Sequence, residues 1–213
     1  MKRWLVLVSL LAPIALHATI VFSNTTNDTG NTFLYSFGPY VEIGDQIALV
    51  STQRAANTAV TQFFNNGGSA GTFDATLRFF QVGAPVGAQI GGSFTATGNS
   101  IASLGVLNVS WALGGLVLPD NVIFTLSVSN LTGSPDLGLD LFDAPTVGTS
   151  SNAFFIAAKS GPIYSQVSSG DVPADSNVYF SLDASAASVP EPGTMLLTLL
   201  ALPAFALARR RLR

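Results

Sequence analysis

Three aspartates, Asp136, Asp140 and Asp143, form the densest group of acidic side chains in this chain of 213 residues. They alternate with leucines in the segment 135–143, Pro-Asp-Leu-Gly-Leu-Asp-Leu-Phe-Asp. If the segment is a strand, the leucines face the core, Asp136 and Asp140 share the outer face, and Asp143 lies past the strand end. Carboxylate oxygens suit Ca²⁺, so the three aspartates are candidate calcium ligands, although their spacing lacks the EF-hand pattern. The alternative is a solvated strand edge whose acidic residues prevent edge-to-edge pairing.

Carboxylates could also support glycoside hydrolysis, which needs only two acids a few ångström apart. However, Glu42 is the only glutamate between the two ends of the chain, and the aspartates are spread over many turn-like segments. Aspartate in turns usually hydrogen-bonds its own backbone. An Asp/Glu-dependent glycoside hydrolase is therefore only an alternative, and we expect a protein that is not an enzyme and has no catalytic residues.

Aromatic side chains offer a different chemistry, because exposed rings stack on the faces of pyranose sugars. Tyr35, Phe37 and Tyr40 cluster around a Gly-Pro pair, and Tyr164 and Tyr179 lie elsewhere. Phe33, Tyr35 and Phe37 share one parity along the chain, which is more typical of core packing. A carbohydrate-binding module is thus an alternative function, with Tyr40 as the residue to test.

The composition excludes several classes of site. The region 19–188 carries eleven acidic and three basic residues, a formal charge of −8, which would repel a phosphate backbone; no nucleic-acid partner is expected. The chain has no cysteine, and its only histidine is His17 near the N-terminus. These counts exclude Ser-His-Asp and Cys-His catalysis, zinc bound by His or Cys, and disulfides. No cofactor is expected other than the calcium considered above.

The elements that would position these residues are strands. The body is rich in Gly, Ser, Thr, Asn, Val and Phe, and apolar and polar residues alternate with period two in several segments. Turn-like clusters at 65–68, 91–92, 119–121 and 133–136 separate them. This pattern predicts an all-β fold, an antiparallel, jelly-roll-like β-sandwich over 19–184. The expected strands cover 20–23, 47–51, 75–82, 93–96, 107–113, 122–129, 153–157 and 178–183.

A helix over 52–61 is a weaker expectation, because the threonines and valine there disfavour it. The small, polar residues of 184–188 are typical of a linker.

The N-terminal residues 1–18 have the pattern of a secretory signal peptide. Lys2 and Arg3 precede an apolar stretch over 4–16, and cleavage after Ala18 would leave Thr19 as the first residue. The alternative is an uncleaved N-terminal anchor.

The C-terminal residues combine a short polar motif, an apolar segment and an arginine cluster. Val189, Pro190, Glu191 and Pro192 precede an apolar stretch over 194–208, and Arg209, Arg210, Arg211 and Arg213 follow it. A helix over 194–208 would span about 22 Å, short of the roughly 30 Å hydrocarbon core, so the membrane would need to thin or the arginines to snorkel. The positive-inside rule keeps the arginines in the cytoplasm. The alternative is a buried helix of a soluble domain.

This C-terminal arrangement resembles the PEP-CTERM sorting signal of exopolysaccharide-producing Gram-negative bacteria. The resemblance implies recognition of Pro190, Glu191 and Pro192 by an exosortase, a membrane cysteine peptidase, with the arginines as the stop-transfer tail. The body also resembles the choice-of-anchor domains of some sorted proteins, at residues 60–66, 71–79 and 85–87. That second resemblance implies a jelly-roll-like fold with no assigned catalytic residues.

The sequence therefore predicts an exported surface or matrix protein with three parts: a signal peptide (1–18), a β-sandwich (19–184), and a linker with a sorting signal (185–213). Its expected partners are the processing peptidase, the inner membrane before processing and, outside the cell, exopolysaccharide. Whether it is released or stays anchored is left open.

Overall fold

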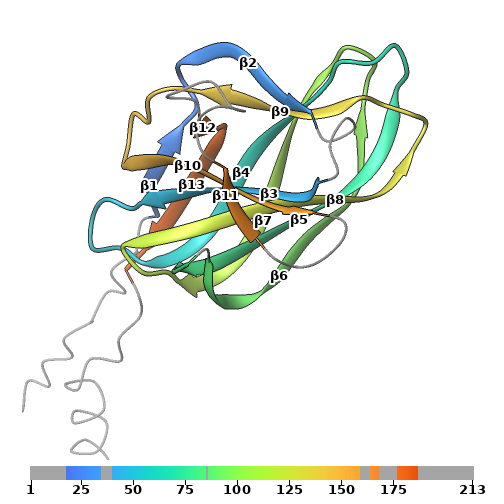
Figure 1. Ribbon diagram of the computed structural model, residues 1–213. Coiled ribbons are helices and arrows are strands. Elements are labelled where there is room, and N and C mark those ends of the chain that lie inside the picture. Colours follow the sequence, from blue (N-terminus) through green and yellow to red (C-terminus); the bar gives the residue numbers. More distant parts are fainter. Residues whose placement is uncertain (1–17, 35–39, 85, 159–163, 168–176, 187–213) are drawn as a thin grey trace, which may run out of the picture.

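The computed structural model describes residues 18–34, 40–84, 86–158, 164–167 and 177–186. Within these ranges every helix or strand is a β-strand, and the strands form two antiparallel sheets (Figure 1). The all-β, antiparallel fold predicted from the sequence is confirmed.

The larger sheet has seven strands in the order β1-β13-β4-β9-β12, with β7 also paired to β4 and β2 also paired to β9. Its strands are β1 (Thr19–Asn24), β2 (Asp28–Leu34), β4 (Ala55–Asn65), β7 (Val106–Val117), β9 (Leu137–Phe142), β12 (Asn177–Val178) and β13 (Phe180–Ser185).

The smaller sheet has six strands in the order β11-β10-β3-β8-β5-β6. They are β3 (Tyr40–Ala48), β5 (Gly71–Val82), β6 (Val86–Ile101), β8 (Asn121–Thr132), β10 (Thr149–Ala158) and β11 (Tyr164–Val167).

The core lies between the two sheets and is built from the period-two pattern of the strands. In β7, for example, Val109, Trp111 and Leu113 are buried while the residues between them are exposed. Phe124 of the smaller sheet stacks on Phe180 of the larger one, with ring centroids 3.9 Å apart. Trp111 also crosses between the sheets, because its indole Nε1 donates to the carbonyl oxygen of Ala75 at 3.2 Å. Aromatic packing across the core therefore fixes one sheet against the other.

Most predicted strands fall within observed ones, but three expectations were wrong. The segment 52–61 is not a helix: most of it belongs to β4, whose buried and half-buried residues alternate. Because β4 is paired on both edges, its ladder hydrogen bonds outweigh local helix propensity. The pair at 91–92 is not a turn but an irregularity within β6, where Gly91 has a φ of +68°. The strand predicted over 47–51 is only the end of β3, which begins at Tyr40.

The two ends of the described domain lie side by side. Thr19 at the start of β1 pairs with Ala184 near the end of β13. Ala184 is fully buried and β13 extends to Ser185, so these two residues belong to the domain and not to the expected linker. The predicted signal sequence up to residue 17 and the predicted sorting signal from residue 187 lie outside the described residues. Among the described residues, no helix is long and apolar enough to cross a membrane.

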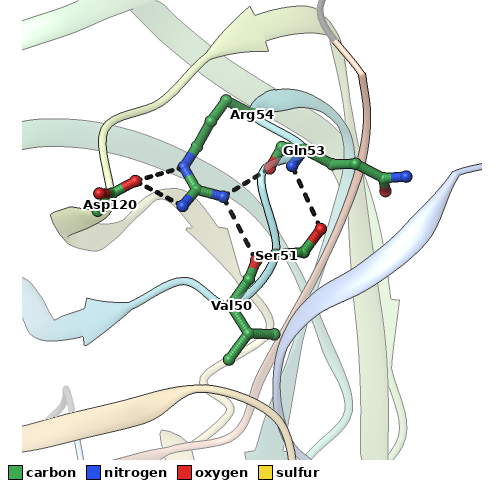
Figure 2. A network of polar contacts seen from close by, with 5 residues as sticks. All are labelled: Val50, Ser51, Gln53, Arg54 and Asp120. Carbon is green, nitrogen blue, oxygen red and sulfur yellow. Dashed lines mark hydrogen bonds and ion pairs between the residues drawn. The ribbon is translucent and has the colours of Figure 1, made fainter.

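An arginine-centred network closes the same end of the sandwich (Figure 2). The guanidinium of Arg54 donates from Nε and Nη2 to Oδ1 of Asp120, at 2.8 and 2.5 Å. Its Nη1 donates to the carbonyl oxygens of Val50 and Gln53. The loop before β4 is thereby held against the turn before β8.

Candidate functional site

The three aspartates predicted to bind calcium are not brought together. The segment is indeed a strand, β9, with Leu137, Leu139 and Leu141 buried and Asp140 half-buried on the outer face. Asp136 precedes β9 and Asp143 follows it, about 23 Å apart along an extended chain at roughly 3.3 Å per residue. Calcium–oxygen distances are about 2.4 Å, so one ion cannot contact both. Among the described residues, no group of three or more Asp, Glu, His or Cys could hold a metal ion.

A different cluster forms around Asp140, where three strands meet. Strand β4 pairs with β13 up to Thr61↔Phe180 and with β9 from Phe63↔Leu139 onward, so Gln62 lies at the change of partner. Tyr179, between β12 and β13, occupies the junction. Its backbone N–H donates to the carbonyl of Asp140 at 3.0 Å, and its own carbonyl accepts from Thr61 Oγ1 at 2.6 Å.

Four side chains of this junction share the outer face of the larger sheet: Gln62, Phe64, Asp140 and Tyr179, here named the junction face. Each is half-buried, whereas their neighbours along the strands, including Phe63, Leu139 and Phe180, are fully buried in the core. Successive residues of a strand point to opposite faces, which places the four side chains outward.

Two aromatic rings share this face with Asp140. The ring of Phe64 lies over Gly138, where an added Cβ would be only 2.2 Å from Phe64 Cε1. Tyr179 is the cross-strand neighbour of Asp140, and its ring makes an edge contact with Phe142 at a centroid distance of 5.0 Å. Gly138 therefore leaves space for the Phe64 ring, and Phe142 supports that of Tyr179.

The carboxylate of Asp140 lies in an unfavourable setting for a charge. Partial burial and, to a smaller extent, the negative charge of Asp28 on β2 together raise its pKa from the ordinary value of 3.8 to about 6. Among the described residues, no donor is hydrogen-bonded to this carboxylate, whereas Asp28 Oδ1 accepts from the Gly30 backbone at 2.8 Å. Asp140 is thus a partly desolvated acceptor to which the described part of the chain supplies no donor.

Further polar groups extend this face across the sheet. Gln62 Nε2 donates to Asn108 Oδ1 on β7 at 3.0 Å, and Thr32 of β2 lies opposite Asp140 in the register. A row of hydroxyl, carboxylate and amide groups beside half-buried rings can both hydrogen-bond a polar ligand and stack on its apolar face.

A second polar cluster lies in the core and does not reach this face. Asp45 of β3 is buried, and the Ser150 hydroxyl donates to it at 3.1 Å. Burial raises the pKa of Asp45 from 3.8 to about 7, against hydrogen bonds from Ser150 and from the backbone of Gln46 and Val178. Ser150 also contacts Asn177, which is equally buried.

Glu42 is buried and therefore cannot form an exposed carboxylate pair of the kind a glycoside hydrolase uses. Its side chain is 3% exposed and receives Arg78 through two nitrogens as well as the Thr125 hydroxyl. This ion pair ties β3, β8 and β5 together.

The other residues predicted as sites are only partly described. Ala18 is exposed immediately before β1. Tyr40 begins β3 and Tyr164 begins β11, but their rings, like Tyr35 and Phe37, lie outside the described residues. So do Val189, Pro190, Glu191 and Pro192 and the four terminal arginines. Phe33 stacks on Phe154 at 6.2 Å, which confirms its predicted place in the core.

Comparison with protein families, with curated proteins and with solved structures gave no match.

Sequence reasoning named Asp140 and Tyr179 separately but did not join them. Gln62 and Phe64 lie in a stretch, 62–74, for which the sequence predicts no strand. A period-two pattern in 59–65, with Ala, Thr, Phe and Asn at alternate positions, was the available sign of a strand.

Proposed function

We propose that this chain is an exported, non-enzymatic surface or matrix protein whose jelly-roll-like sandwich binds polysaccharide through the junction face. The observation that carries the binding role is the half-buried Asp140 carboxylate, which has no hydrogen-bond donor among the described residues and shares the junction face with Phe64 and Tyr179. Pyranose sugars present hydroxyl donors at their edges and C–H groups on their faces, so they match both kinds of surface.

The pairing of Thr19 with Ala184 supports the proposed topology. Because the first and last strands are neighbours, a signal peptide and a sorting tail would leave the domain at one end. Phe64 lies nine residues along β4 from Ala55, which pairs with Ser185; the separation is about 30 Å at roughly 3.3 Å per residue. The junction face would therefore point away from the membrane.

The binding role is tested with the purified full chain in detergent on columns of its native exopolysaccharide. Tyr179→Ala and Phe64→Ala should each weaken retention by about tenfold or more, since one aromatic contact with a sugar contributes about 1–2 kcal/mol. Tyr164→Ala, on the other sheet, is the matched control. Equal retention of all four proteins would show that the junction face does not bind the polymer.

The proposed signal peptide and sorting signal are tested by measuring the intact mass of the protein recovered from the native envelope and medium. Export and exosortase-type processing predict a species beginning near Thr19 and ending near residues 189–192. A species that keeps the terminal arginines would mean a bitopic membrane protein and would remove the support for sorting.

A glycoside hydrolase is the second candidate, favoured by one observation. Asp140 has a raised pKa beside the charge of Asp28, as a general acid beside a second carboxylate would. We favour binding because these groups lie on the outer face of a sheet, whereas hydrolysis benefits from a site that excludes water. Release of new reducing ends that is lost in Asp140→Asn would establish the hydrolase instead.

A further inference from the structure

The charge around the junction face is uniformly negative. Asp28 and Asp140 interact electrostatically across β2 and β9, and Asp183 lies on β13 of the same sheet, where its Oδ1 accepts from the Thr58 backbone at 3.0 Å. Among the described residues the only cations are Arg54 and Arg78, and each is already paired with a carboxylate.

Neither arginine belongs to this face. Arg54 precedes β4 at the opposite end of that strand and pairs with Asp120. Arg78 lies on β5 of the other sheet and pairs with Glu42. No cation in the described part of the chain therefore offsets Asp28 and Asp140, and a ligand has to supply one if the two charges are to be balanced.

We infer that the junction face binds a polysaccharide of amino sugars that carry free ammonium groups. This inference rests on the proposed function and names the ligand class for the same site. An ammonium group has three N–H donors and a positive charge, so it can donate to the Asp140 carboxylate, for which the described residues supply no donor, and offset the charge of Asp28. The sugar ring stacks on Tyr179 or Phe64, and a cation near a ring face gains a further electrostatic attraction.

The charge also disfavours the other classes of polymer. Uronic-acid or sulfated chains would place like charges beside Asp28 and Asp140. Neutral chains could stack on the rings and donate hydroxyls, but they would leave the two carboxylates without a counter-charge. N-acetylation of the amino sugar removes the positive charge while keeping the ring, which provides a matched ligand pair.

The test uses the full chain in detergent at low salt and about pH 6.5, above the pKa of about 6 of the Asp140 carboxyl, with isothermal titration of matched pentasaccharides. The ligands are a β-1,4-glucosamine oligomer and its fully N-acetylated form. We expect the amine form to bind at least about tenfold more tightly, and this preference to shrink with added salt. Asp140→Asn and Asp28→Asn should each remove most of the preference for the amine form, because each removes one of the two negative charges.

Asp120→Asn is the control, because it makes the same change in charge at the far end of the sandwich. Equal affinity for the two oligomers would overturn the inference while leaving polysaccharide binding intact. Binding of neither oligomer, together with no retention on the native polymer, would overturn the proposed function itself. If Asp120→Asn and Asp140→Asn reduced the preference for the amine form equally, the effect would come from the net charge of the protein, which would also overturn the inference.

Discussion

At the scale of single residues, Asp45 is an ionisable side chain that is buried in the core. It lies between Ile43 and Ile47 on the core face of β3, opposite Phe124 of β8. A carboxyl group in that position is more easily accommodated when it is neutral, because burial penalises the charged form. Its hydrogen bonds with Ser150 and the backbone reduce that penalty without removing it.

The raised pKa of Asp45 predicts a stability that falls with pH. The folded protein holds this proton up to about pH 7, whereas the unfolded chain releases it near 3.8. The stabilisation is therefore complete below about pH 4 and is lost as the pH rises to about 7, a change on the order of a few kcal/mol. Urea unfolding across this range should show a steeper decline for the wild type than for Asp45→Asn.

Asp74 provides a control of opposite sign. It is half-buried, and hydrogen bonds from Asn130 and the Gly98 backbone lower its pKa. The contribution of Asp74 to folding stability is therefore lost as the pH falls. The Asp74→Asn variant should still show the decline in stability between pH 4 and 7 that is predicted for the wild type. If the wild type and Asp45→Asn gave parallel curves, the Asp45 proton would not be linked to folding.

Residue identity alone could not have located these sites. The alternation of apolar and polar residues in β5, β7, β8 and β9 predicts strands because every second residue is strongly apolar. Asp45 occupies a core position in such a pattern, and its polarity made β3 look irregular. The junction face depends on which strands are neighbours, and it brings together Gln62, Asp140 and Tyr179, which are between 39 and 117 positions apart in the sequence.

At the scale of strands, Gly138 links the packing of β9 to the position of the Phe64 ring. An added methyl group would overlap two carbons of that ring and approach the Phe33 carbonyl oxygen at 2.8 Å. Gly138→Ala should therefore destabilise the fold by about 1–3 kcal/mol, as overpacking does, and displace Phe64 from the junction face. Urea unfolding and retention on exopolysaccharide measure the two effects.

Gly68→Ala is the matched control for this change. No heavy atom lies within 4 Å of a Cβ placed there, so the free energy of unfolding should change by less than about 0.5 kcal/mol. Equal stability of the two variants would contradict the packing of Phe64 on Gly138.

The two ion pairs of the described domain should differ in their contribution to stability. Arg78→Met leaves the buried Glu42 carboxylate without its cation and should cost about 3–5 kcal/mol. Asp120→Asn removes a partner that is 79% exposed, while Arg54 keeps its backbone acceptors, so the cost should stay below about 1 kcal/mol.

A double variant separates lost attraction from uncompensated charge. Glu42→Gln with Arg78→Met leaves no buried ion and should recover part of the stability lost in Arg78→Met alone. Thermal or urea unfolding of the three variants gives the comparison. A double variant less stable than either single one would argue against charge burial as the cause.

At the scale of the whole molecule, the strand order separates an attachment end from a binding end. The Thr19↔Ala184 pair and the Arg54 network lie at one end of β4, and Phe64 lies near the other. Two sheets with aromatic contacts across their shared core would hold these two ends at a fixed separation. Such an arrangement suits a protein that is tethered at one point and contacts a polymer at another.

The absence of cysteine makes this separation directly testable. A single cysteine can be introduced in the full chain at exposed Asn108, beside Gln62 on the outer face, or at exposed Thr52, at the attachment end. Coupling a bulky maleimide polymer to Asn108→Cys should abolish retention on exopolysaccharide, because the polymer covers the junction face. The same label on Thr52→Cys should leave retention unchanged, since Thr52 precedes the far end of β4 and the seven residues from Gln62 to Ala55 alone span about 23 Å. Equal loss from both labels would mean that the polysaccharide contacts the sandwich over its whole length, and equal retention would move the binding surface away from the junction face.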